Sequence, residues 1–262
     1  MKNRPHLGVL LLILFFGAIA VAVTCLHISF YIPLIISAVA VSLTAKKRYA
    51  VVAIGGPTIW VDGPKSAKRD LKDLKRGIDI AISTIALVIT LPAMVLIALA
   101  IKLTTRGAVL YIQERIGEGS KPFQMIKFRS MHLNAEPEGP ALARVNDPRI
   151  TKIGRALRKT RLDELPQLWN VLKGDMTLVG PRPERQYFID LITERAPNYA
   201  RLQRLKPGLT SMGIVRFGYA SSVEEMIDRQ RHDQYYFENR SLALDLCILA
   251  ETLDVVLRRK GK

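Results

Sequence analysis

The stretch IDIAISTIALVITLPAMVLIALAIKL, residues 78–103, decides the fold of this chain. A bilayer is spanned by about 20 apolar residues, so the stretch is long enough. Pro92 lies in its middle, and a proline inside a helix removes a backbone hydrogen bond and kinks the helix. Basic residues flank both ends of the stretch: Lys75, Arg76, Lys102 and Arg106. Because basic segments stay on the cytoplasmic side, we predict a re-entrant membrane helix over residues 78–104, broken at Pro92 and returning to the face it entered. A kinked spanning helix is the alternative.

A second apolar run precedes this one, over residues 7–45. Its length suits two helices joined near residues 27–33, and basic residues lie at both of its ends. The sequence therefore predicts a transmembrane helical hairpin over residues 1–48, followed by a linker rich in glycine and proline over residues 49–67. A cleaved signal peptide is the alternative, although its apolar core would be roughly 7–15 residues long.

Composition agrees with a membrane-attached protein. The chain has 262 residues, a net charge of +16 and 49% hydrophobic residues, which excludes a disordered chain. Its two cysteines, Cys25 and Cys247, are too few and too far apart in the sequence for a disulfide framework or a zinc cluster.

Residues 68–262 form the predicted catalytic domain. Short strand-like runs occupy residues 109–112 and 123–126, and residues 117–120 can turn between them. After residue 155 the pattern is mostly helical, while residues 206–210 are typical of a turn. A basic amphipathic segment at residues 65–76 predicts a helix lying on the membrane surface. The fold class is therefore α+β, mainly helical, with a small mixed cytoplasmic domain.

Three features of this domain could carry chemistry. Asp163 and Glu164 are adjacent, follow a run of arginines and precede a helix-like segment, which suits a divalent metal bridging to phosphates. A capping aspartate among solvated arginines is the alternative. The second feature is Gly180-Pro181-Arg182-Pro183-Glu184, a stiff loop whose arginine can grip phosphate, or else a simple turn. The third is Lys127-Phe128-Arg129, at the end of a strand-like run, or else an ordinary edge strand.

In this order, these features resemble the bacterial sugar transferase family, the polyprenyl-phosphate sugar-1-phosphate transferases, over roughly residues 68–260. The resemblance begins with Lys75, Arg76, Asp79 and the helix containing Pro92. The further matching motifs are Gln113–Gly117, Lys127–Met131, Asp147–Thr151, Leu157–Lys159, Leu162–Gln167, Asn170–Met176 and Val179–Glu184.

The resemblance implies transfer of a sugar 1-phosphate from a UDP-sugar to undecaprenyl phosphate, with Mg²⁺ as cofactor and release of UMP. It implies that Asp163 is the nucleophile, forming a covalent phosphosugar intermediate and binding the metal, and that Glu164 is its partner. The remaining residues implied to bind substrate are Lys127, Arg129, Arg158, Arg182 and Glu184.

The resemblance also implies a bacterial inner-membrane protein with its catalytic domain on the cytoplasmic face. Its partners would be the bilayer, the donor and the lipid acceptor, without nucleic acid, and a homodimer is one possible assembly. Two departures stand out: Leu91 precedes the bending proline where the family often has a small hydroxyl residue, and residues 211–215 differ from the usual segment. The sugar is therefore left open. A membrane-tethered binder of anionic lipid or nucleic acid is the alternative that rests on charge alone, and a nucleotide-sugar hydrolase is another.

Overall fold

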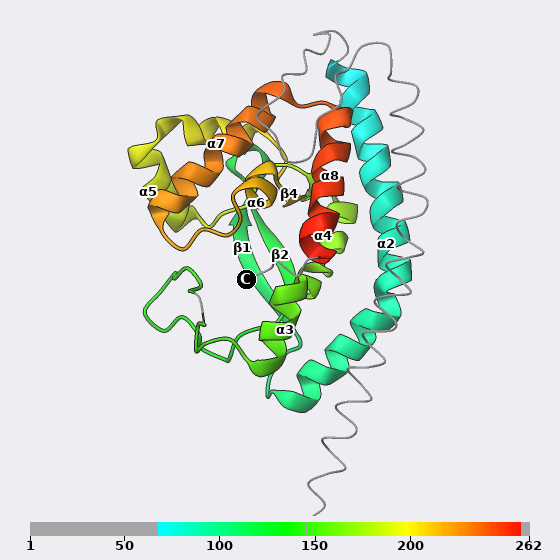
Figure 1. The fold of residues 1–262 in the computed structure, drawn as a ribbon, viewed down its shortest axis with the longest axis vertical. Helices are drawn as coiled ribbons and strands as arrows, with labels where there is room; N and C mark the ends of the chain where they lie inside the picture. The colour runs from blue at the N-terminus through cyan, green and yellow to red at the C-terminus, as the bar shows by residue number, and fades with distance from the viewer. Residues whose placement is uncertain (1–67, 145, 258–262) are drawn as a thin grey trace, which may run out of the picture. The chain divides into compact units, whose positions relative to one another are not determined.

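The computed structural model describes residues 68–144 and 146–257 of the chain, coloured in Figure 1. The predicted hairpin (1–48) and linker (49–67) lie outside the described residues. The described chain is mainly helical with two small two-stranded sheets, which confirms the predicted α+β class. The chain divides into two compact units, and the middle of the first helix, Ile89–Ile97, falls in a different unit from the elements that carry the site.

Helix α2, Lys68–Thr104, is the long apolar element. It runs without interruption through Pro92, so the expected break at this proline is not seen in its helical assignment, and re-entry into a membrane stays a prediction. The described part of the expected amphipathic helix is simply the start of α2. One series of large apolar side chains on α2 is more than half exposed: Leu74, Ile85, Val88, Leu91, Val95, Leu99 and Leu103. Among the described helices, α2 alone has the length and apolar composition needed to cross a bilayer, over Lys72–Thr104.

Strands β1 (Leu110–Ile116) and β2 (Pro122–Phe128) form the antiparallel hairpin that the sequence predicted. The turn between them contains the 3₁₀ helix Glu118–Ser120. Gly119 has a φ of 69°, a left-handed conformation that glycine adopts without steric cost. Leu110 pairs with Phe128 and Ile116 with Pro122, so Lys127 lies at the far end of the hairpin from the turn.

The rest of the domain is helical, as the sequence predicted, and Figure 1 shows these helices gathered around the hairpin. The elements are α3 (Lys152–Thr160), η2 (Leu162–Glu164), α4 (Gln167–Lys173), α5 (Gln186–Arg195), η3 (Pro197–Arg204), α6 (Met212–Arg216), α7 (Val223–Asn239) and α8 (Leu242–Leu257). A buried apolar cluster joins α5, η3 and α7 to the end of β1, and includes Ile116, Phe188, Ile192, Leu202 and Met226. This cluster packs the three helical elements against the end of β1.

A second sheet pairs β3 (Thr177–Val179) in parallel with β4 (Gly208–Thr210). The expectation of a mere turn at residues 206–210 is therefore wrong. The backbone here passes too close for a side chain, because a Cβ on Gly208 would lie 2.2 Å from the backbone nitrogen of Gly180. Only glycine allows this approach, and the pairing fixes the point at which β3 gives way to the loop containing Arg182.

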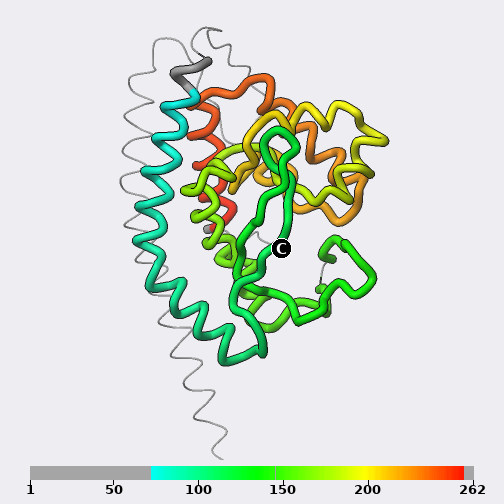
Figure 2. The backbone as a smooth tube through the Cα atoms, turned by 180° about the vertical axis from the view of Figure 1, so that it is seen from behind, coloured from blue at the N-terminus to red at the C-terminus, as the bar shows by residue number. Residues whose placement is uncertain are grey.

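Three polar residues near the start of α2 bind the catalytic domain, and we call them the α2 anchor: Lys75, Arg76 and Asp79. Lys75 Nζ lies 2.5 Å from Asp245 Oδ2 on α8, which runs beside the start of α2 in Figures 1 and 2. Arg76 donates to the carbonyl oxygens of Val171 (2.6 Å) and Leu172 (2.7 Å), and so caps the C-terminal end of α4.

Asp79, the third anchor residue, is only 4% exposed. It accepts from the Thr177 hydroxyl at 2.6 Å and from the Leu178 amide at 3.2 Å. Asp79 is therefore buried against β3.

Candidate active site

The two adjacent carboxylates lie in η2, a single 3₁₀ turn between α3 and α4. Arg161 ends α3 in a left-handed conformation (φ 56°), and its amide donates to the carbonyl oxygen of Arg158. The chain thereby reverses direction and turns Asp163 and Glu164 inward, where each is 8% exposed. The expectation that an aspartate caps the following helix is wrong, because Pro166 occupies the N-cap of α4.

Glu164 is the carboxylate that is neutralised by the protein. Its Oε1 lies 3.3 Å from Lys127 Nζ on β2 and 3.8 Å from Arg182 Nη1 on the loop after β3. Burial alone would raise its pKa, but the positive charges of Lys127, Arg182 and Arg161 outweigh burial and hold that pKa below the ordinary range. Glu164 is therefore ionised at neutral pH and holds two cations in the site.

Asp163 differs from its neighbour. No Lys, Arg or His nitrogen of the described chain lies within 4.0 Å of its carboxylate. Burial and the negative charge of Glu164 raise its pKa above the ordinary range, against the opposing charges of Lys127 and Arg158. The carboxylate is more basic than a solvated one, and no cation of the described residues forms an ion pair with it.

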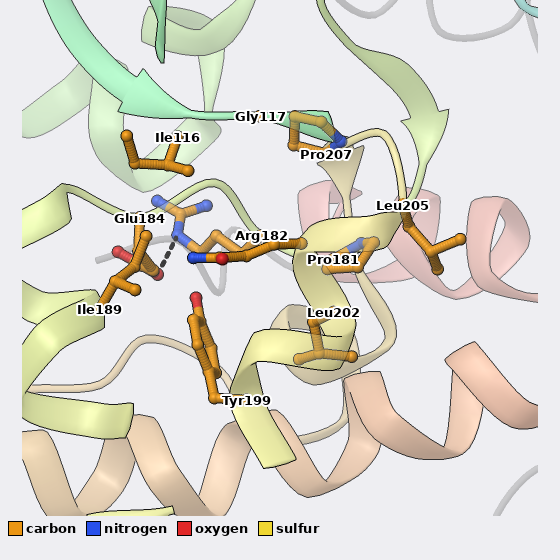
Figure 3. Close-up of a pocket in the computed structure, with 11 residues that line it drawn as sticks. Ile116, Gly117, Pro181, Arg182, Glu184, Ile189, Tyr199, Leu202, Leu205 and Pro207 are labelled. Atoms are coloured by element: carbon orange, nitrogen blue, oxygen red, sulfur yellow. Dashed lines mark ion pairs between the residues drawn. The ribbon is translucent and has the colours of Figure 1, made fainter. Parts of the chain in front are cut away.

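The loop after β3 presents Arg182, and Glu184 fixes that loop. Glu184 is 5% exposed and forms ion pairs with Arg229 and Arg115. Its Oε1 lies 2.6 Å from Arg229 Nη2, and its Oε2 lies 3.2 Å from Arg115 Nη1. Figure 3 shows the Arg182 side chain directed toward Glu184, with Nε and Oε1 3.9 Å apart. The cavity drawn there, about 20 Å³ and lined also by Tyr199, has room for little more than one water. Glu184 therefore acts on the site through Arg182.

An aromatic ring joins two of the arginines. Tyr219, after α6, has the guanidinium carbon of Arg161 5.0 Å and that of Arg182 5.2 Å from its ring centre. Neither Tyr219 nor Arg161 was among the predicted site residues. Arg161 was visible only as one member of a basic run, and nothing in the sequence pairs residue 219 with the dyad.

Two other predicted substrate ligands occupy different places. The positive charge of Arg158, in the last turn of α3, lowers the pKa of Asp163, which puts it near the dyad. Arg129 lies instead at the end of α2, where Nη2 donates to Thr105 Oγ1 at 2.7 Å. The structure thus brings together Lys127, Asp163, Glu164, Arg182 and Glu184. Arg129 instead contacts the residue that follows α2.

The residues present fit Mg²⁺ bound jointly with a substrate. The described chain holds no group of three or more His, Cys, Asp or Glu side chains placed for a metal. Mg²⁺ seldom needs such a cage, because it binds through one or two carboxylates, waters and substrate phosphates. Asp163, a buried carboxylate with no cation of the described protein against it, is a suitable single ligand.

Comparison with known proteins now identifies the family. The sequence profile of the bacterial sugar transferases matches residues 71–259. The chain belongs to this family. The resemblance inferred from the sequence motifs is confirmed, and the profile covers every element that contributes to the site described above.

Curated relatives give the names under which such proteins are known. A UDP-N-acetylgalactosamine-undecaprenyl-phosphate N-acetylgalactosaminephosphotransferase of Aeromonas hydrophila is 41% identical over 188 residues, 72% of this chain and 44% of that protein. A UDP-glucose:undecaprenyl-phosphate glucose-1-phosphate transferase of Caulobacter vibrioides is 41% identical over 70% of this chain and 69% of its own length. A putative undecaprenyl-phosphate N-acetylgalactosaminyl 1-phosphate transferase of Bacillus subtilis is 47% identical over 52% of this chain and 74% of its own length. The match thus spans less than half of the Aeromonas protein, and the sugar differs among the relatives.

Proposed function

We propose that this sugar transferase moves a sugar 1-phosphate from a UDP-sugar to undecaprenyl phosphate, through a covalent intermediate on Asp163, and releases UMP. The names of the relatives support the reaction. The observation that carries the assignment of Asp163 is the asymmetry of the dyad: Glu164 is neutralised by Lys127 and Arg182, whereas no cation of the described residues lies within 4.0 Å of the Asp163 carboxylate.

In the first step, a carboxylate oxygen of Asp163 attacks the β-phosphorus of the donor. The bond between this phosphorus and the bridging oxygen breaks, and UMP leaves with the electron pair. A carboxylate approaches an anionic phosphate only where positive charge offsets the repulsion, and Lys127, Arg182 and Arg158 supply that charge. Mg²⁺, when bound, stabilises the charge on the phosphate oxygens.

In the second step, an oxygen of undecaprenyl phosphate attacks the same phosphorus, and the Asp163 carboxylate leaves. The product is a lipid-linked sugar diphosphate, and Asp163 is free for another donor. One site thereby serves a water-soluble donor and a lipid acceptor in turn. The exposed apolar series on α2 supports a location at a membrane, and we assign the catalytic domain to the cytoplasmic face of the inner membrane.

The test is UMP release from a panel of UDP-sugars by the purified full chain, with Mg²⁺ and with or without undecaprenyl phosphate. We expect lipid-dependent release with at least one sugar. UMP release that needs no lipid and continues over many turnovers would instead make the protein a hydrolase. Absence of release from folded protein with every sugar would favour the binding alternative.

The intermediate has its own test. Donor labelled in the sugar should leave label on the wild-type chain in the absence of acceptor, and undecaprenyl phosphate should then remove it. Asp163→Asn should take up no label. Asp228→Asn, which alters an exposed carboxylate paired with Arg231, is the matched control and should label normally. Labelling of Asp163→Asn would refute the assignment of the nucleophile.

A further inference from the structure

Arg161 is a buried cation that forms no ion pair with any described carboxylate. It is 8% exposed, and no carboxylate oxygen of the described chain lies within 4.0 Å of its guanidinium. Its Nε is buried and has no hydrogen-bond partner in the structure. A buried charge that is neither paired nor fully hydrogen-bonded is costly, so an arginine in this state indicates a missing anion.

Two of the neighbouring cations are already engaged. Lys127 lies against Glu164, and Arg182 lies between Glu164 and Glu184. Arg161 is two residues from Asp163, and its charge is felt at Glu164. Arg161 therefore adds positive charge at the dyad beside that of Arg158, where an anion bound at Asp163 would meet it.

Tyr219 holds this cation in place. Its ring faces the guanidinium groups of Arg161 and Arg182, and the electron-rich face of an aromatic ring attracts such cations while leaving their N–H groups available. Burial and the charge of Glu164 raise the pKa of the Tyr219 hydroxyl to about 12, so the ring stays neutral under physiological conditions. Two like charges can thus be kept beside one another before substrate arrives.

We propose that Arg161, oriented by Tyr219, binds the diphosphate of the nucleotide donor as a second arginine beside Arg182. The planar guanidinium suits the oxygens of a diphosphate, to which it can donate two parallel hydrogen bonds. Arg161 is then a substrate-binding residue and Tyr219 a positioning residue. The inference rests on the proposed function, because it takes the donor to be a nucleoside diphosphate sugar.

The test measures binding of UDP to the full chain in detergent by calorimetry, independently of turnover. Arg161→Asn is the variant of choice, because asparagine tolerates the left-handed backbone at this position. Losing one charged hydrogen-bonding partner should weaken UDP binding about ten- to hundredfold. Tyr219→Leu should weaken it about three- to tenfold, while Tyr219→Phe, which keeps the ring, should bind like wild type.

A matched control exists elsewhere in the domain. The guanidinium carbon of Arg201 lies 5.3 Å from the ring centre of Phe237, and Arg201 forms an ion pair with Glu238, outside the dyad. Arg201→Asn should leave UDP affinity unchanged. In turnover, Arg161→Asn should raise KM for the UDP-sugar more than it lowers kcat, whereas a variant that is merely less stable would leave KM unaltered.

The outcomes separate the two proposals. If wild type binds UDP and turns over donor, but Arg161→Asn and Tyr219→Leu bind UDP as tightly as wild type, this inference is overturned and the proposed function stands. If Arg161→Asn weakens binding to undecaprenyl phosphate vesicles and not to UDP, the assignment to the donor is wrong. If wild type binds no UDP and releases no UMP, both proposals fall. Should Arg161→Asn not fold, Tyr219→Leu against Tyr219→Phe decides the matter.

Discussion

Replacing Asp79 by leucine should remove two hydrogen bonds that attach the start of α2 to the catalytic domain, and so destabilise the protein. The carboxylate is 4% exposed and accepts two hydrogen bonds, from the Thr177 hydroxyl and the Leu178 amide, both of which are themselves buried. Hydrogen bonds to a charged group contribute about 1.5–3 kcal/mol each, and leucine would leave both donors unsatisfied. Removal of the carboxylate also relieves its own desolvation, which offsets part of this loss. We expect a net loss near 3 kcal/mol, or a fall in Tm of about 6–12 °C for a domain of this size.

The assay is thermal unfolding of the full chain in one detergent, with UMP release measured on the same samples. Asp73→Leu is the control, since Asp73 is an exposed carboxylate on the same helix and should change Tm by no more than about 2 °C. Thr177→Val removes the hydroxyl that donates to Asp79 and leaves no unsatisfied donor at residue 177. Its Tm should therefore lie between those of wild type and Asp79→Leu. At temperatures below its new Tm, where Asp79→Leu is still folded, its rate of UMP release should also be lower than that of wild type. The reason is that β3, which Asp79 contacts, leads directly to Arg182. Equal Tm values for Asp79→Leu and Asp73→Leu would refute the reasoning.

Three further predictions concern single contacts. Lys127→Met removes the nearest cation from Glu164 and should lower kcat for UMP release about 10²-fold with the fold retained; an unchanged kcat would contradict the role assigned to this lysine. Gly154→Ala would put a Cβ 1.9 Å from the carbonyl oxygen of Ser130, so backbone must move, and unfolding should show a loss of about 1–3 kcal/mol; a Tm equal to wild type would mean that α3 shifts freely. Hydrogen bonds from the arginine two residues later hold the pKa of Asp147 well below its ordinary range, so its stabilising effect is full above about pH 4 and fades as pH falls further. The Tm difference between wild type and Asp147→Asn should therefore shrink below that pH, and a constant difference would exclude this linkage.

Sequence patterns predicted the parts of the fold that depend on local chemistry. The strand runs around Gly117–Ser120, the helices after residue 155 and the apolar α2 all follow from periodicity and turn residues. One expectation failed because a tertiary contact decided it. Residues 206–210 look like a turn in isolation, yet Gly208 pairs with β3. Nor could a sequence pattern predict that Asp79 would be buried beside Thr177 and Leu178, about a hundred residues away.

The candidate site divides in the same way. The motifs pointed to Lys127, Asp163, Glu164 and Arg182 as a group, and the structure brings them together. The motifs could not predict that Arg129, two residues after Lys127, would bind Thr105 at the end of α2. The sequence around a basic residue does not show which distant group it will contact. Tyr219 was not predicted as a site residue for a related reason. It contacts Arg161, which ends α3, from a loop that is distant in the sequence.

The α2 anchor has a consequence for the order in which the molecule assembles. Lys75 is joined to Asp245 across 170 positions of chain, and Arg76 and Asp79 to partners 95 or more positions away. Contacts of such sequence separation are slow to form, and a chain made at about 5–20 residues per second exposes Lys75 to the cell long before Asp245 exists. The start of α2 is thus held by a residue that is synthesised 170 positions later. A nascent chain that stops short of α8 should therefore lack the ion pair of Lys75 with Asp245, so that α8 completes the attachment of α2 to the catalytic domain.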